Sequence, residues 1–157
     1  MSVQPVRAPV GARMEDKLGF WLRIAASHLN QDCARRLQHG GLTPPEWVAL
    51  RLIGDAGAMA PSWLAEAMAT TRGGASKLVS RLEARGLVQR TAAPVDRRGQ
   101  VLRLTAQGLA LSIRMTETAD EVEGAFFAPL SPDEATLLRS LLARILRERG
   151  HPGSPAG

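Results

Sequence analysis

The stretch from Thr71 to Gly108 constrains the fold of this chain most, because it combines one amphipathic helix with a following hairpin. Apolar residues recur in its first half at the spacing of a helix that packs one face inward: Ala75, Leu78, Val79 and Leu82. The opposite face carries only small and basic residues: Gly73, Ser76, Lys77, Ser80, Arg81 and Ala84. We therefore expect a helix whose outward face is small and positively charged.

A hairpin should follow this helix. Gly86 stands where a helix C-terminus favours a left-handed residue, and it is expected to end the helix. Two runs rich in Leu and Val come next, at residues 87–91 and 100–104, and the segment between them contains Pro94, Asp96 and Gly99, which favour a turn. A helix followed by a hairpin with a basic tip is typical of a winged helix.

Positive charge is concentrated in the same stretch. Residues 72–103 contain eight Arg or Lys and two acidic residues, a net charge of +6, whereas the whole chain carries +5. A run of basic residues is usually only a solvated helix face. Here the charge coincides with small residues that let a backbone approach a groove and with a second basic loop, which favours nucleic-acid binding.

These residues also carry a family resemblance. The runs LEARGLVQR, PVDRRG and VLRLTAQG resemble the signature of the MarR family of bacterial transcriptional regulators. The similarity continues upstream through LTPPEWVALRLI and WLAEAMATTRGGASKLVSRL, and it covers residues 14–149. A D-R-R tip followed closely by a strand ending in L-T-x-x-G is a much narrower pattern than a bare helix-turn-helix. The resemblance implies a homodimeric winged helix-turn-helix regulator, a repressor by our interpretation.

Helix signals divide the region before this stretch. Apolar residues recur every three or four positions over residues 14–39, and Gly40 and Gly41 should end that helix. The run Thr43–Glu46 combines a cap, two prolines and a capping-box Glu, which starts a helix over residues 44–53 that Gly54 and Gly57 should break. A short helix is expected over residues 61–68. The turn at residues 69–71 lacks the glycine often found there.

Two helices are expected after the hairpin. Thr105 should cap a helix that reaches Phe127, with Leu109, Ile113, Val122 and Phe126 among its apolar members. A second capping box, from Ser131 to Glu134, starts the last helix. That helix carries an apolar stripe wider than one neighbouring helix needs, and we predict that it contacts a second copy of the chain together with Leu18 and Leu22. The stripe consists of Leu137, Leu138, Leu141, Leu142, Ile145 and Leu146.

The predicted fold is mainly α with a small β-hairpin wing (α+β). A chain of 157 residues that is 45% apolar can form one domain with a core. We expect a disordered tail at 1–13, an N-terminal dimerisation helix at 14–42, a winged helix-turn-helix DNA-binding domain at 43–105, C-terminal dimerisation helices at 106–149 and a disordered tail at 150–157.

Composition argues against several other classes of protein. The three histidines are scattered, and only His28 has a carboxylate nearby, that of Asp32, so we expect no enzyme, metal site or cofactor. No apolar run reaches the length of a membrane span, and no secretion signal begins the chain. A single cysteine agrees with a reducing compartment. The expected location is the cytoplasm.

Contacts with double-stranded DNA can be assigned by residue. A helix in the major groove would present Thr71, Arg72, Ser76 and Lys77 near its N-terminus and Arg81 to a flanking phosphate. At the hairpin tip, the resemblance implies that Asp96 braces Arg98 in the minor groove, with Arg97 beside it. The family often has Asp at the position of Ser80, so an acidic partner for nearby arginines is missing here.

The resemblance also raises a ligand question. In the family the first two helices line a cleft that binds aromatic anions, and a small-molecule effector could contact Trp21, Arg23, His28, Trp47 and Arg51. The alternative for Trp47, as for Trp63, is a packing role. Some relatives sense peroxides through a cysteine in the first helix, but this chain has no tyrosine to supply the hydroxyl partner, and Cys33 lies on the apolar stripe, which favours a core role.

Two other function classes remain open from the residues alone. An architectural protein that coats DNA without sequence preference would use the same basic helix and wing. A module that binds no DNA is the other class, and binding that ignores salt would identify it.

Overall fold

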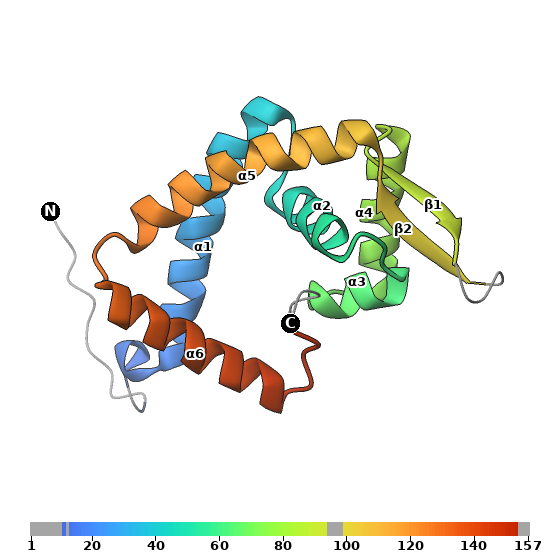
Figure 1. Ribbon diagram of the computed structural model, residues 1–157. Coiled ribbons are helices and arrows are strands. Elements are labelled where there is room, and N and C mark those ends of the chain that lie inside the picture. The colour runs from blue at the N-terminus through green and yellow to red at the C-terminus, as the bar shows by residue number, and fades with distance from the viewer. Residues whose placement is uncertain (1–10, 12, 94–98, 154–157) are drawn as a thin grey trace, which may run out of the picture.

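The computed structural model describes residues 11, 13–93 and 99–153, and within them the chain forms six α-helices and one two-stranded hairpin (Figure 1). In chain order the elements are a 3-10 turn at Met14–Asp16, α1 (Leu18–Leu37), a second 3-10 turn at Gln38–Gly40, α2 (Pro44–Ala56), α3 (Pro61–Ala67), α4 (Arg72–Ala84), β1 (Val88–Ala92), β2 (Gln100–Leu104), α5 (Ala106–Phe127) and α6 (Pro132–Glu148).

The hairpin completes a winged helix. Strands β1 and β2 pair antiparallel, with Val88 opposite Leu104 and Ala92 opposite Gln100. Met59, in the loop before α3, adds one further bridge to Leu102 at the hairpin's inner edge. This arrangement confirms the predicted fold class, mainly α with a small β-hairpin wing.

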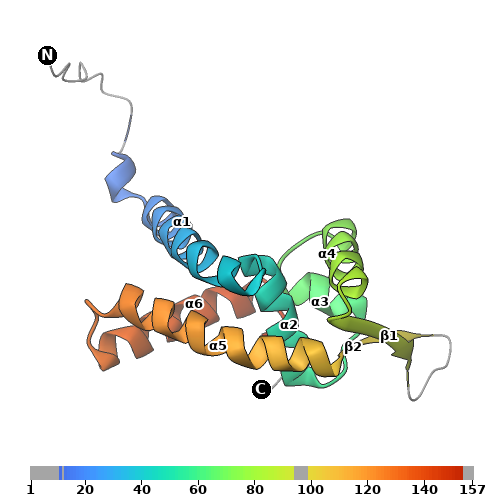
Figure 2. The same cartoon turned by 90° about the horizontal axis from the view of Figure 1, so that it is seen from above.

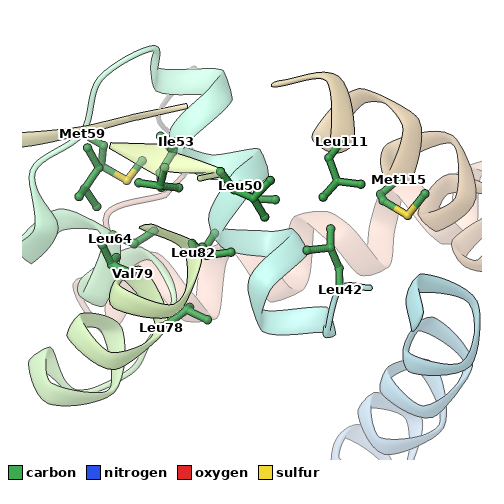
Figure 3. Packing of buried hydrophobic residues seen from close by; sticks show 14 of the residues in the cluster. Leu42, Leu50, Ile53, Met59, Leu64, Leu78, Val79, Leu82, Leu111 and Met115 are labelled. Carbon is green, nitrogen blue, oxygen red and sulfur yellow. The ribbon is translucent and has the colours of Figure 1, made fainter. Parts of the chain in front are cut away.

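The core surrounds α2. Leu50 and Ile53 of α2 are fully buried together with Leu64 of α3 and Leu82 of α4. On the other side of α2, Leu111 of α5 closes the same cluster (Figure 3). The inward face predicted for α4 is confirmed, because all four of its apolar residues are buried.

Helix α5 joins the two ends of the molecule. It starts at the hairpin, packs on α2 and α1, and leads to α6, which lies far from the wing (Figures 1 and 2). Helix α6 contains no buried residue, and the first half of α1 is also exposed. The chain therefore has a packed winged-helix part and an arm of helices that is only partly covered.

A small hydrogen-bonded junction fixes α5 to the end of α4. The Thr105 amide donates to the Leu87 carbonyl at 3.1 Å, and its hydroxyl donates to the Gly86 carbonyl at 2.6 Å. The same hydroxyl accepts from the Gly108 amide at 3.0 Å and so caps α5. A Cβ on Gly108 would overlap the Leu87 carbonyl. The L-T-x-x-G pattern is therefore explained by one cap and one close approach of backbones.

The start of α1 and the end of α2 differ from the sequence prediction. Helix α1 begins at Leu18 and not at Met14, because Lys17 is extended (φ −97°, ψ 116°) and separates a short 3-10 turn. Gly54 does not break α2, which continues to Ala56. A glycine inside a helix costs only about 1 kcal/mol, and here the backbone of Gly54 lies under Leu104.

The apolar members expected on α5 do not all face inward. Leu109 and Ile113 are exposed, at 49% and 55% of their surface, whereas Leu111 and Met115 are buried. Apolar residues occur on both sides of this helix, so periodicity alone does not select the face that meets α1 and α2.

The turn between α3 and α4 contains no glycine, and an alanine supplies the backbone conformation that the turn needs. Ala69 has a φ of 49° and is the single non-glycine residue with positive φ among the described residues. The backbone amide of Thr70 donates to the Ala65 carbonyl at 3.0 Å, which holds the turn closed. Ala69 thus takes the left-handed conformation that glycine usually supplies.

The expected tails lie partly outside the described residues, which exclude 1–10, 12 and 154–157. At the C-terminal end, residues 150–153 are described. There the His151 ring approaches the Ala67 carbonyl of α3 through Nε2, at 3.0 Å.

Candidate DNA-binding interface

The N-terminal half of α4 forms an exposed, positively charged surface. Thr71 caps the helix, since its hydroxyl accepts from the Gly74 amide at 3.0 Å. Arg72, Ser76 and Lys77 follow on the exposed face, opposite the buried stripe. Helix N-termini carry partial positive charge, which adds to that of the side chains. The structure therefore brings four of the predicted DNA contacts together on one accessible face.

Acidic residues are distributed unevenly around this face. Arg72 and Lys77 make no ion pair within the part of the chain that the structure describes. Arg81, one turn further, lies with Nε 3.7 Å from Oε1 of Glu46. Arg85 donates to Oε2 of the same carboxylate at 3.3 Å. The unpaired charge is thus at the start of α4 and the paired charge at its end.

A further ion pair, between Arg90 and Glu83, attaches the wing strand β1 to α4. Arg90 donates through Nε to both carboxylate oxygens of Glu83, each at 3.1 Å. A small cleft of about 130 Å³ beside this pair is lined in part by Ser62 of α3 and by Arg72 and Ser76 of α4. The ion pair therefore holds β1 against α4, and α3 borders the same cleft.

The predicted tip residues Asp96, Arg97 and Arg98 lie outside the described residues. The strands leading to them are described. Beyond β1, the Ala93 amide still donates to the Gly99 carbonyl at 2.9 Å, so the hairpin continues up to the tip segment.

The predicted ligand residues on α1 are all exposed. Trp21 is 54% exposed, and its indole N–H donates to the Glu15 carbonyl at 2.7 Å. Arg23 and His28 are exposed further along the helix. The cleft between α1 and α5, of about 450 Å³, is lined by other side chains.

The two predicted ligand residues on α2 are differently placed. Trp47 packs against the core, and its buried indole N–H has no hydrogen-bond partner in the described part of the chain. Arg51 pairs with Asp55 at 2.9 Å, one turn along α2. The structure does not gather the five candidate residues around either of its two larger clefts, the second of which lies between α5 and α6.

Cys33 has the surroundings of a packing residue. It is partly buried against the core, and burial raises the pKa of its thiol, with smaller contributions from the carboxylates of Glu123 and Asp32. A raised thiol pKa lowers the thiolate fraction and hence the reactivity. Among the described residues, no group of His, Cys, Asp and Glu is arranged to hold a metal ion. No described helix is both long and apolar enough to cross a membrane.

The predicted dimerisation residues form an uncovered apolar surface. Leu18 is 88% exposed on α1 and Leu22 is 55% exposed, while Leu137 of α6 is 59% exposed. Leu142 is partly buried. The remaining four stripe residues are exposed: Leu138, Leu141, Ile145 and Leu146.

Sequence reasoning missed three residues of this interface. Glu46 was assigned only to the capping box of α2, and Glu83 and Arg90 were counted only as charges. Glu46 of α2 pairs with Arg81 and Arg85 at the end of α4. Glu83 of α4 pairs with Arg90 of β1. The charge pattern holds no signal for such pairs, because their partners are set by packing.

Comparisons with known proteins agree on one family. A family model described as the MarR family matches residues 40–99. The transcriptional regulator HosA of Escherichia coli O111:H- is 31% identical over 131 residues, which are 80% of this chain and 97% of HosA.

Solved structures share the fold. BpsR of Bordetella bronchiseptica, whose DNA binding is regulated by 6-hydroxynicotinic acid, superposes with a TM-score of 0.79 and 26% identity over 87% of this chain and 97% of its own. A mutant of Escherichia coli MarR in complex with operator DNA has a TM-score of 0.75 and 23% identity, over 82% of this chain and 93% of that one.

Proposed function

The chain belongs to the MarR family of transcriptional regulators, and we propose that it binds a near-palindromic operator as a homodimer and represses transcription there. The observation that carries this proposal is the uncovered apolar surface of α6 and α1 on a chain that has a basic, exposed α4. One such helix offers few base contacts, whereas two copies double them.

The proposed contacts place α4 in the major groove. Thr71, Arg72, Ser76 and Lys77 reach base edges or phosphates there, and Arg81 reaches a flanking phosphate. Asp96 braces Arg98 in the adjacent minor groove, with Arg97 beside it, as the family resemblance implies. An arginine in a narrow minor groove reads the shape of the duplex.

The proposed dimer is closed by a two-fold axis, so that the same patch of each chain meets its copy. Two recognition helices would then read half-sites about 10 base pairs apart. Burial contributes roughly 1.5 to 3 kcal/mol for each large apolar side chain, before entropy is counted. Five of the six stripe residues are 37–59% exposed, so burial against a second copy would contribute part of this amount for each of them, on both chains.

Genomic pull-down tests the proposal. Purified protein is mixed with genomic DNA fragments, and the retained fragments are sequenced and footprinted. We expect one protected near-palindrome and, in transcription in vitro from the adjoining promoter, less transcript when the protein is added. Retention of all fragments alike would favour the architectural alternative, and more transcript would favour activation.

A small aromatic anion is proposed to release the operator. The support is the regulation of BpsR by 6-hydroxynicotinic acid, together with the aromatic and basic residues Trp21, Arg23, His28, Trp47 and Arg51. A ligand would have to draw these side chains together, and it loosens DNA only if it binds that arrangement better than the DNA-bound one. Salicylate is a suitable probe. Stabilisation against heat without weaker DNA binding would contradict the switch.

A further inference from the structure

We propose that Glu46 is a positioning residue for DNA recognition, whose buried carboxylate on α2 holds Arg81 and Arg85 at the end of the recognition helix α4. This inference rests on the proposed role of α4 as the DNA reader. Helix α4 offers no free acid of its own, because its single acidic residue, Glu83, is engaged by Arg90. The structure supplies the missing acid from a different helix.

The geometry joins the start of α2 to the end of α4 at one carboxylate. Glu46 is only 6% exposed. Its Oε2 accepts from the Thr43 amide at 3.0 Å and from Arg85 at 3.3 Å, and its Oε1 lies 3.7 Å from Nε of Arg81. The side chain of Arg81 is nevertheless 62% exposed. Arg81 therefore forms an ion pair, without a hydrogen bond, on its Nε side, and the rest of its guanidinium remains accessible to a phosphate or a base edge.

Helix capping alone does not explain this arrangement. Glu134 makes the same capping box with Ser131 at the start of α6, yet Glu134 is exposed and pairs with no arginine among the described residues. A buried carboxylate is unfavourable unless it is paired and hydrogen-bonded. The burial of Glu46 and its two arginines are therefore features beyond the cap.

An arginine whose orientation is set by a carboxylate affects the specificity of DNA binding more than its affinity. A flexible arginine binds the phosphates of any duplex, whereas a directed one favours the sequence whose groove and backbone fit its position. The carboxylate also repels phosphates in general, which weakens binding to unrelated DNA. The direction of the arginine raises the ratio of operator affinity to unrelated-duplex affinity, whereas the repulsion acts on both duplexes alike.

The test is Glu46→Gln, since glutamine also serves at this capping position but carries no charge. Affinities are measured over a range of salt for the retained operator fragment and for an unrelated duplex of equal length. We expect operator affinity to fall about tenfold, a value within the range for one directed arginine contact. Affinity for the unrelated duplex should stay equal or rise. Glu134→Gln is the matched control and should change neither affinity.

A double-mutant cycle tests whether Glu46 acts on DNA binding through Arg81. In an Arg81→Gln background, Glu46→Gln should no longer change the affinity ratio by more than about twofold, a threshold near the usual additivity error. An equal loss for both duplexes, or an undiminished effect in both the Arg81→Gln and Arg85→Gln backgrounds, would overturn the inference.

Two further outcomes are distinguishable. If Glu46→Gln unfolds the chain, Arg85→Gln is tested instead, because Arg85 is the hydrogen-bond donor and is more exposed than Glu46. This variant should also lower the ratio of operator affinity to unrelated-duplex affinity. An unchanged ratio would overturn the inference. If the unmodified protein prefers no fragment to the unrelated duplex, the proposed function fails, and that failure is seen before any variant is made.

Discussion

Replacing Gly108 by alanine tests the junction between the recognition helix and α5. A Cβ at this position would lie 2.8 Å from the Leu87 carbonyl carbon and would overlap the carbonyl oxygen. Real Cβ atoms essentially never approach another atom more closely than 3.0 Å. The neighbour is backbone and cannot rotate away, so the start of α5 must move. That movement breaks the hydrogen bonds from Thr105 to Leu87 and Gly86.

The magnitude follows from these losses. Two hydrogen bonds contribute about 1 kcal/mol each, and overpacking typically costs about 1 to 3 kcal/mol. Alanine regains about 1 kcal/mol over glycine inside a helix. We therefore expect the free energy of unfolding to fall by about 2 to 4 kcal/mol, a large part of the usual total of about 5 to 15 kcal/mol.

Urea denaturation followed by circular dichroism measures this change, at one fixed protein concentration because dimerisation shifts apparent stability. Gly124→Ala is the matched control in the same helix, where a Cβ meets nothing within 4 Å. It should raise the free energy of unfolding by about 0.5 to 1 kcal/mol. If both variants shifted stability in the same direction, the close approach at Gly108 would be refuted.

Four other changes give separate expectations. Ala69→Gly should raise the free energy of unfolding by up to about 1 kcal/mol, because it relieves a left-handed alanine; a loss of stability in urea would contradict the turn geometry. Lys77→Ala should weaken all duplexes alike and reduce the slope of log affinity against log salt by about one, and an unchanged slope would remove this residue from the interface. Changing Leu141 and Ile145 together to Asp should give a monomer or misfolded protein in sedimentation, whereas unmodified protein sedimenting only at 16.8 kDa while still binding a palindrome tightly would exclude the proposed dimer. Cys33 should react with iodoacetamide at neutral pH more slowly in the folded than in the unfolded chain, because burial raises the pKa of its thiol; equal rates would show that the thiol is not shielded.

The local features of the chain could be predicted from its sequence. Thr43, Thr105 and Ser131 cap the helices that they were expected to cap, and the four apolar residues predicted on the inner face of α4 are buried. These features depend on residues within a turn or two of one another, and the short-range physics of capping and periodicity decides them. The exposed basic face of α4 follows directly, because it is the side of the helix opposite the buried residues.

Features that depend on distant neighbours were decided only by the tertiary structure. The same Glu46 is the expected cap residue and also the buried partner of Arg85, 39 residues away, and no local pattern distinguishes these two roles. The sequence did not select the inward face of α5 for the same reason: Leu109 is apolar yet exposed, because apolar residues on both sides of a helix are equivalent until a neighbour covers one side. A residue's type fixes what it can bind; its burial and its partner depend on which segments the packed core brings beside it.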